Sequence, residues 1–350
     1  MTGMTSTLNH RLEGFSLYHA RMKGSHFDAG HRWGELLRKN GKVLDTCPTF
    51  ELREAQIAFA KVCLPHYETH FPEVIDEIRG IADGNGVPFE TLCAMLFSMY
   101  CFTFQNKCTC FAFRTAEETV FARNSDFLVS LEKSNMNCLY TLDEGYAFNA
   151  NTTAFVQMED GINEYGLAAG LTFVYPHLRA PGLNAGMLLR YMLEKCKTTA
   201  EAIEALSHLP IASAQTLTLA DRTGDIAVVE CNPAVIEVIR PRPDELFVAT
   251  ANNFNSEKMR PYRNPEIDDW RSDERCRTAR TALLQHADTY GVPFAKDVLS
   301  GKTGFMCQYD RKSDADTVWS VVYDLKRKEI WRCEGNPSRK RFLEDTRMKF

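Results

Sequence analysis

Apolar residues in the first third of the chain recur with helical spacing. Between residues 50 and 101 they fall at every third or fourth position, which gives each stretch one hydrophobic face. Proline and glycine divide this region into three predicted helices: one over 50–71, one that begins at Pro72 and stops at the Gly-Asn-Gly turn of 84–86, and one that begins after Pro88. The third is apolar nearly all round, which indicates a buried helix.

From Cys108 onward the pattern changes to that of short strands. β-Branched and aromatic residues gather in short runs, and turn residues separate the runs. We predict strands over 108–113, 118–124, 137–142, 153–158 and 166–173. Two helices follow, over 186–196 and 199–209.

The last third of the chain alternates between hairpins and a helix. We predict a hairpin over 216–231, a helix over 272–289 and a closing hairpin over 317–333. The whole pattern predicts an α+β fold in which antiparallel strands dominate and helices pack on the faces of the sheets.

Composition and charge narrow the class of protein. Apolar residues make up 44% and charged residues 25% of the 350, which is typical of a globular chain. The formal charge is -5 and no basic run occurs, so we expect no nucleic-acid partner. The most apolar window, 92–105, is too short to span a bilayer, and no apolar export signal precedes it. We therefore expect a cytoplasmic protein without a membrane partner, whose twelve scattered cysteines are reduced.

The strands that begin at Cys108 bring chemically distinctive residues together. A tight turn centred between Thr115 and Ala116 would set Cys108 opposite Arg123, and a shift of one residue would set it opposite Asn124. Asp126 follows just beyond. A cation beside a thiol favours the thiolate, and a carboxylate can orient an amine or the guanidinium. Strict alternation puts Arg123 and Asp126 on opposite faces unless the strand ends or bulges near them.

Other readings of these residues stay open on the sequence alone. Cys108 could be an ordinary buried cysteine, and Arg123 and Asp126 a surface pair. A redox pair of Cys108 and Cys110 would need a bent strand, because Cα atoms two residues apart on a strand lie about 6.6 Å from each other. His66 and His70 form an isolated pair on one helix face, so we expect no metal. The P-loop and the GxGxxG and GxSxG motifs are absent, and we expect no cofactor.

A nucleophilic Cys108 would lack a histidine base nearby in the sequence. The general solution without histidine is an N-terminal nucleophile, whose own α-amine serves as the base. Cys108 is internal, so this chemistry requires cleavage of the Lys107–Cys108 bond.

Several segments in the right order resemble one family. The series begins with Cys108-Thr109, followed about fifteen residues later by Arg123-Asn124-x-Asp126. Together with the segments 160–174, 217–231, 249–254, 272–275 and 317–338, it resembles the N-terminal-nucleophile hydrolases of the choloylglycine hydrolase and isopenicillin-N acyltransferase type. The resemblance implies a four-layer αββα sandwich over 108–350, preceded by a helical prosegment over 1–107.

The resemblance also implies roles for individual residues. Cys108 would be the nucleophile both of self-cleavage at Lys107–Cys108 and of turnover. Arg123 would favour its thiolate, and Asp126 would hold the α-amine or ammonium.

The remaining implied roles concern the oxyanion and the charge balance. Asn252 would donate its side-chain N–H to the oxyanion, together with a backbone N–H near Thr172 and Phe173. Arg275 would hold Asp126 or balance the charge of the site. Taken without the resemblance, Asn252 could be a turn cap and Arg275 part of a solvated helix face.

The activity that follows is that of a linear-amide hydrolase or an acyltransferase. It would act on a small-molecule N-acyl amine or acyl-amino acid, or on a thioester donor, through a Cys108 acyl-enzyme. Lys107 stands where the acyltransferases have glycine, and Thr172 stands where several bile-salt hydrolases have asparagine. The prosegment would remain bound because its apolar helix needs cover, and a homo-oligomer is compatible with these expectations. The alternatives are an uncleaved thiol-based redox protein and a catalytically silent binding module.

Overall fold

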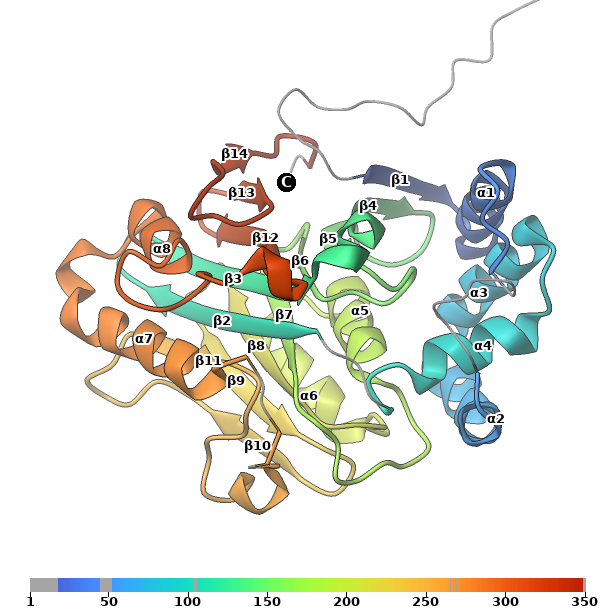
Figure 1. The fold of residues 1–350 in the computed structure, drawn as a ribbon, viewed down its shortest axis with the longest axis horizontal. Helices are drawn as coiled ribbons and strands as arrows, with labels where there is room; N and C mark the ends of the chain where they lie inside the picture. The colour runs from blue at the N-terminus through green and yellow to red at the C-terminus, as the bar shows by residue number, and fades with distance from the viewer. Residues whose placement is uncertain (1–17, 45–51, 103–105, 265, 268–269, 349–350) are drawn as a thin grey trace, which may run out of the picture.

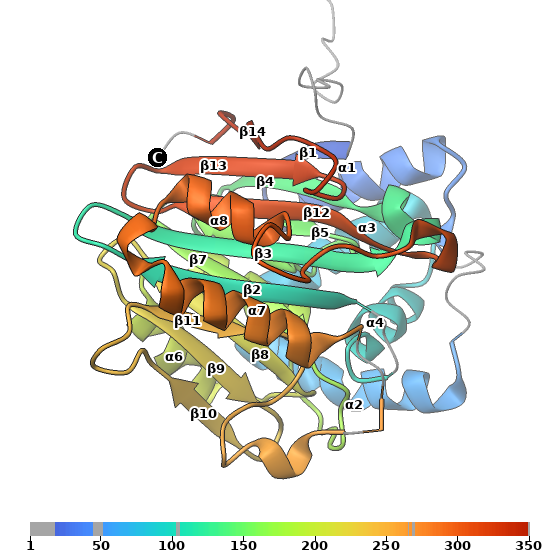
Figure 2. The same cartoon turned by 60° about the vertical axis from the view of Figure 1, so that its left-hand side comes forward.

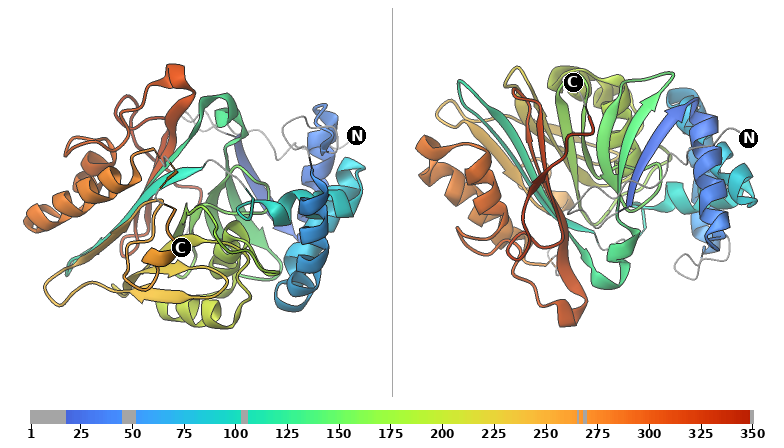
Figure 3. Two further views of the ribbon diagram at one scale, coloured as in Figure 1. Left: turned by 60° about the horizontal axis from the view of Figure 1, so that its bottom comes forward. Right: turned by 90° about the horizontal axis from the view of Figure 1, so that it is seen from above.

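The computed structural model describes residues 18–44, 52–102, 106–264, 266–267 and 270–348. Two β-sheets stack face to face in its centre, and helices cover both outer faces (Figures 1 and 3). This is the predicted α+β arrangement with two sheets between helical layers.

The larger sheet has eight strands in the order β1-β4-β5-β6-β7-β8-β9-β10. Its strands are antiparallel except for β1, which runs parallel to β4. The strands are β1 (Tyr18–Gly24), β4 (Met136–Leu142), β5 (Phe148–Thr152), β6 (Asp160–Asn163), β7 (Leu167–Phe173), β8 (Gln215–Asp221), β9 (Ile226–Cys231) and β10 (Ile236–Ile239).

The smaller sheet has six strands in the order β11-β2-β3-β12-β13-β14, all antiparallel. Two adjacent inner strands, β2 and β3, form the hairpin predicted to carry Cys108 (Figure 2). The strands are β2 (Lys107–Arg114), β3 (Thr119–Leu128), β11 (Phe247–Thr250), β12 (Ala315–Asp324), β13 (Glu329–Glu334) and β14 (Leu343–Glu344).

Helices form the two outer layers. α7 (Ser272–Gln285) and α8 (Val292–Leu299) pack on the smaller sheet. α5 (Ala185–Lys195) and α6 (Thr199–His208) pack on the larger one. In the described part of the segment before Cys108, four more helices stand beside the α5–α6 layer: α1 (His26–Lys39), α2 (Glu54–His70), α3 (Pro72–Asn85) and α4 (Phe89–Ser98) (Figure 1).

Each interface between layers has its own apolar core. Phe121, Ile162 and Trp319 pack between the two sheets. Phe111 and Val322 pack with α7 and α8 on the other face of the smaller sheet. The largest cluster joins the outer face of the larger sheet, α5 and α6 to the helices that precede Cys108. The N-terminal segment therefore shares a continuous core with the rest of the protein.

The segment before Cys108 is not helical throughout. Its first element is β1, which extends the larger sheet by pairing with β4 from Tyr18 opposite Met136 to Gly24 opposite Leu142. Neither β1 nor α1 is among the elements predicted from the sequence. The predicted strand over 153–158 is also wrong, because those residues form turns and isolated bridges between β5 and β6.

Helices α1 and α3 touch backbone to backbone. Gly30 and Gly34 of α1 face Gly80 and Gly84 of α3, and a Cβ atom added at any of the four would overlap a carbonyl group of the facing helix. Only glycine permits this separation, since any larger residue would push the two helix axes apart.

In the part of the chain that the structure describes, no helix combines the length and the apolar character that crossing a bilayer requires.

Candidate active site

The β2–β3 hairpin is offset from the predicted one. Its loop comprises residues 115–118, in which the Thr115 hydroxyl accepts hydrogen bonds from the backbone N–H groups of Glu117 and Glu118 at 3.2 and 2.9 Å. Cys108 therefore pairs with Ser125, not with Arg123 or Asn124, because the loop has four residues rather than two. Since this slip spans two residues, Cys108 and Arg123 still share one face of the sheet.

The Cys108 thiol lies beside the guanidinium of Arg123. Arg123 Nη2 donates to Sγ at 2.8 Å, and Sγ donates to Oδ1 of Asn106 at 2.8 Å. Both Cys108 and Arg123 are fully buried. Burial raises the pKa of the Cys108 thiol to about 12, and the charge of Arg123 offsets only part of that rise. In the intact chain Cys108 is therefore protonated, although a cation that favours the thiolate is in contact with it.

Arg123 is held from the larger sheet. Its Nη1 forms an ion pair with Asp160 at 2.8 Å, and its Nε donates to the carbonyl of Leu171 at 3.1 Å. Gly170 leaves room for the side chain, since a Cβ atom there would lie 3.1 Å from Cδ of Arg123 and 3.2 Å from Sγ of Cys110. The guanidinium is thus fixed across the gap between the sheets, which contradicts the reading of Arg123 as part of a surface pair.

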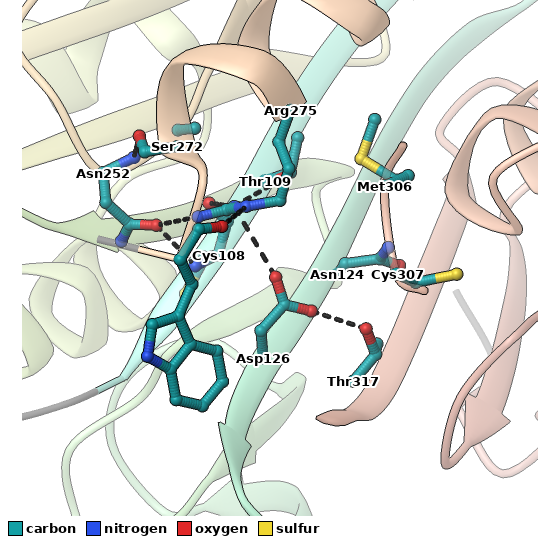
Figure 4. Close-up of polar contacts among 12 residues, drawn as sticks. Cys108, Thr109, Asn124, Asp126, Asn252, Ser272, Arg275, Met306, Cys307 and Thr317 are labelled. Carbon is teal, nitrogen blue, oxygen red and sulfur yellow. Dashed lines mark hydrogen bonds and ion pairs between the residues drawn. The ribbon is translucent and has the colours of Figure 1, made fainter. Parts of the chain in front are cut away.

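The backbone of Cys108 is held on both sides by side chains from outside the hairpin. Its N–H donates to Oδ1 of Asn252 at 2.9 Å, and its carbonyl accepts from Arg275 Nη1 at 2.7 Å (Figure 4). Arg275 also donates to Oδ1 of Asn252 at 2.8 Å and to the Thr109 hydroxyl at 2.7 Å. Arg275 is fully buried, so it does not belong to a solvated helix face.

Asp126 lies on the face of the hairpin opposite to the thiol. β3 runs unbroken past it, and the irregularity falls in the neighbouring strand β12, between Thr317 and Trp319. The Asp126 carboxylate accepts from the hydroxyls of Thr317 and Tyr309 at 2.6 and 3.0 Å and lies 3.5 Å from Arg275 Nη1. Arg275 therefore connects it to the backbone of Cys108.

The pH dependence of stability should report on Asp126. Burial raises the pKa of its carboxyl from 3.8 to about 6, although Arg275 and the two hydroxyls oppose the rise. Folding therefore favours the neutral carboxyl. Its contribution to the unfolding free energy is fully present below about pH 4 and is lost as the pH rises through about 6. Relative to Asp126→Asn, we expect the unfolding free energy to fall by about 3 kcal/mol over this range. Urea unfolding of both chains in a Cys108→Ala background measures this, and a flat or rising difference contradicts it.

Asn252 is positioned by the start of α7 and by β7. Its backbone N–H donates to the hydroxyl of Ser272 at 2.8 Å, and its Nδ2 donates to the carbonyl of Phe173 at 2.9 Å. In the intact chain its amide oxygen, rather than an N–H, thus faces Cys108. The Thr172 hydroxyl donates to the carbonyl of Ala251 at 2.7 Å and thereby holds the residue before Asn252.

The residues around the scissile bond are buried as well. Lys107 is 1% exposed, and its ammonium lies 4.0 Å from the ring centre of Tyr175 and 5.7 Å from that of Phe173. Such cation–π contacts favour a charged side chain in a site with little water.

Sequence reasoning missed two fully buried residues near the thiol, Asn106 and Glu159. Asn106 directly precedes Lys107, and Glu159 directly precedes the segment that begins at Asp160. Their place in the sequence next to these predicted features was the only signal that could have found them.

Among the described residues, no group of three or more His, Cys, Asp or Glu side chains could hold a metal ion, and Cys108 and Cys110 carry free thiols.

Comparisons with known proteins give the family and the fold. The profile of the family described as acyl-coenzyme A:6-aminopenicillanic acid acyl-transferase matches residues 113–339. No curated protein matches the sequence. Among solved structures, a mutant of the conjugated bile acid hydrolase from Clostridium perfringens is 15% identical, over 69% of this chain and 93% of its own, with a TM-score of 0.50.

Two further structures are similar at a lower score. Penicillin V acylase from Agrobacterium tumefaciens is 18% identical, over 65% of this chain and 83% of its own, with a TM-score of 0.46. The Caenorhabditis elegans ortholog of N-acylethanolamine-hydrolyzing acid amidase is 17% identical, over 63% of this chain and 93% of its own, with a TM-score of 0.47.

The profile match starts five residues after Cys108 and covers well over half of the chain. Arg123, Asp126, Asn252 and Arg275 all lie inside it. The match to the bile acid hydrolase concerns the fold alone, and it confirms the predicted sandwich of N-terminal-nucleophile hydrolases. The chain belongs to the acyl-coenzyme A:6-aminopenicillanic acid acyl-transferase family, one of the families with the N-terminal-nucleophile fold.

Proposed function

We propose that the protein is a self-cleaving cysteine hydrolase or acyltransferase with Cys108 as its nucleophile. The observation that carries this proposal is the set of contacts on Cys108: Arg123 on the thiol, Asn252 on the N–H and Arg275 on the carbonyl. These contacts hold every polar group of one internal cysteine. They suit a residue that must attack its own preceding peptide bond and then act from a fixed position.

The self-cleavage step exchanges a C–N bond for a C–S bond. Sγ of Cys108 attacks the carbonyl carbon of Lys107, and the thiol proton ends on the Cys108 nitrogen as the peptide bond breaks. Water then hydrolyses the thioester, which leaves a carboxylate on Lys107 and a free thiol and α-amine on Cys108. Asn252 Oδ1, which accepts from the amide N–H in the intact chain, is in position to hold that α-amine.

Turnover repeats the same chemistry on a substrate. The α-amine takes the thiol proton, Sγ forms a bond to the acyl carbon, and the leaving amine takes the proton. Water or another nucleophile then releases the acyl group from the thioester. Arg123 favours the thiolate. The second N–H of the Asn252 amide, the one that does not donate to Phe173, and the backbone near Thr172 stabilise the oxyanion.

The substrate class in this proposal is a small linear, non-peptide amide, either an N-acyl amine or an acyl-amino acid. The family's description names acyl transfer from a thioester, acyl-coenzyme A, to an amine, 6-aminopenicillanic acid. The product of that transfer is an amide, so the bond formed is the kind of bond that an amide hydrolase breaks. Both directions pass through the same Cys108 thioester, so one site suits a hydrolase and a transferase alike.

The N-terminal segment would stay bound after the cut. Trp33, Tyr67 and Ile78 belong to the same apolar core as Phe148 and Leu189. Buried polar contacts cross the same boundary: Arg190 pairs with Glu77 at 2.9 Å, and His26 contacts Glu194 at 2.5 Å. Removing the segment would expose this core, take Glu77 away from Arg190 and take His26 away from Glu194.

Intact mass and gel filtration test the proposal. The 39.8 kDa chain should split into residues 1–107 and 108–350, the two chains should elute together, and the split protein should hydrolyse members of a panel of N-acyl amines and acyl-amino acids. A chain that never splits and turns over nothing contradicts the proposal. An uncleaved redox protein would instead lose two hydrogens of mass on mild oxidation and regain them with dithiothreitol. A binding module would bind members of the panel without turnover.

A further inference from the structure

In the intact chain, the side-chain amide of Asn106 fills the space between the Cys108 thiol and the carboxylate of Glu159. Its Oδ1 accepts from Sγ at 2.8 Å, and its Nδ2 donates to Oε2 of Glu159. All three residues are fully buried. A carboxylate can only accept and the thiol donates, so the partners fix which end of the amide faces which group.

This arrangement has the layout of an amide substrate. The carbonyl oxygen of a carboxamide lies at the nucleophile, and its nitrogen lies at a buried carboxylate. Asn106 is on the side of the cut that leaves with residues 1–107. When that end withdraws, Sγ loses an acceptor and Glu159 loses a donor, and a planar group with the same polarity would restore both contacts.

Glu159 is held in place independently of Asn106. The Thr153 hydroxyl donates to its Oε1 at 2.5 Å, the Ser125 hydroxyl lies 3.4 Å from Oε2, and Arg123 Nη2 lies 3.5 Å from the same oxygen. The carboxylate therefore keeps its position when Asn106 departs, but with one fewer strong donor. A buried carboxylate that lacks a donor is costly, so a ligand that supplies an N–H there is favoured.

We propose that Glu159 binds the leaving nitrogen of the substrate and selects amides that carry an N–H over esters and tertiary amides. This inference rests on the proposed function of the same site. In the bound substrate the amide N–H donates to Glu159. Sγ then forms its bond to the acyl carbon, the C–N bond breaks, and the nitrogen takes the thiol proton relayed by the α-amine of Cys108. The departing amine keeps an N–H on Glu159, whereas an ester would turn an oxygen lone pair toward the carboxylate.

Matched substrates test this on the processed enzyme. The probes are the p-nitroanilide, the N-methyl-p-nitroanilide and the p-nitrophenyl ester of one acyl group, in a phenylacetyl and a decanoyl series. We expect Glu159→Gln to lower kcat/KM for the anilide by about 100-fold, because the amide retains a polar group but no longer supplies a charged acceptor. Its kcat/KM for the ester should be unchanged or higher. Equal losses on anilide and ester, or no loss on the anilide, would overturn the inference.

Further measurements separate this inference from other failures. Glu164→Gln, an exposed glutamate of the same chain segment, is the matched control and should change none of the rates. If Glu159→Gln does not self-cleave, the wild-type enzyme provides the test. Its kcat/KM for the anilide should exceed that for the N-methyl anilide by about 100-fold or more, and a ratio near one overturns the inference. Wild-type protein that splits and turns over the panel without this preference refutes the role of Glu159 alone. Wild-type protein that neither splits nor turns over any probe refutes the proposed function.

Discussion

Cys108→Ala is expected to give a protein that stays at 39.8 kDa and turns over no amide. Self-cleavage and turnover both need Sγ of this residue, and among the described thiols it is the one that accepts a hydrogen bond from Arg123. The loss should be on the order of 10⁴-fold or more, as for removal of a nucleophile that acts as a unit with its partners. Intact mass after days of incubation and the amide panel measure the two losses separately. Retained turnover would refute Cys108 as the nucleophile.

Cys110→Ala is the matched control for this experiment. Cys110 is on the same strand and face, is equally buried and pairs directly with Arg123. Its replacement removes a thiol from the core between the sheets but leaves every contact of Cys108 in place. The variant should split and turn over like the wild type, with a modest cost in stability of about 1 kcal/mol from the lost packing. Loss of activity in Cys110→Ala would instead favour a reaction in which both thiols take part.

Gly80→Ala is expected to lower the unfolding free energy by about 3 kcal/mol. In an ordinary helix interior the same change would add about 1 kcal/mol of stability, so the sign of the effect is itself diagnostic. The added Cβ would overlap the carbonyl of Phe27 and lie 2.8 Å from the backbone nitrogen of His31. Both obstacles are backbone atoms of α1, so only a separation of the two helices can relieve them.

Urea unfolding in the Cys108→Ala background measures this effect on a chain of one defined length. Asp76→Ala provides the comparison, because Asp76 is an exposed position of the same helix and alanine is the better helix former there. That variant should be neutral or slightly stabilised. A Gly80→Ala protein as stable as Asp76→Ala would mean that α1 and α3 do not meet as closely as described.

Periodicity predicted most of the fold, and its failures have more than one cause. Helices α2 to α4 and the strands of the hairpins have clear local patterns, so α2 to α4, β2, β3, β8, β9, β12 and β13 were predicted. β1 and β6 have weak ones, because their place in the sheet comes from partners elsewhere in the chain. The register of β2 and β3 was missed for a different reason. The hydrogen bonds of Thr115 favour a four-residue loop, and nothing in the strand pattern reports on loop length.

Only the site residues that belong to a recognisable sequence motif could be predicted. Cys108, Arg123 and Asp126 lie on one hairpin, so their proximity followed from the sequence. Asn252 and Arg275 were predicted by family resemblance, since α7 and the strand before it reach the hairpin only through the tertiary fold. Asn106 and Glu159 belong to no motif. Their relation to the thiol depends on how the two sheets pack together, which places Glu159 beside Ser125 of β3 and which local spacing does not encode.

The parallel pairing of β1 with β4 has a consequence for how the molecule is made. β1 leaves the ribosome well before its partner, which begins more than a hundred residues later in the chain. The edge of the larger sheet therefore closes only after the β2–β3 hairpin has been synthesised. While the Lys107–Cys108 bond is intact, it tethers β1 near β4 at a high effective concentration and limits the search for this distant contact. The bond that the enzyme is proposed to cut thus first acts as the tether that lets its two future chains find each other.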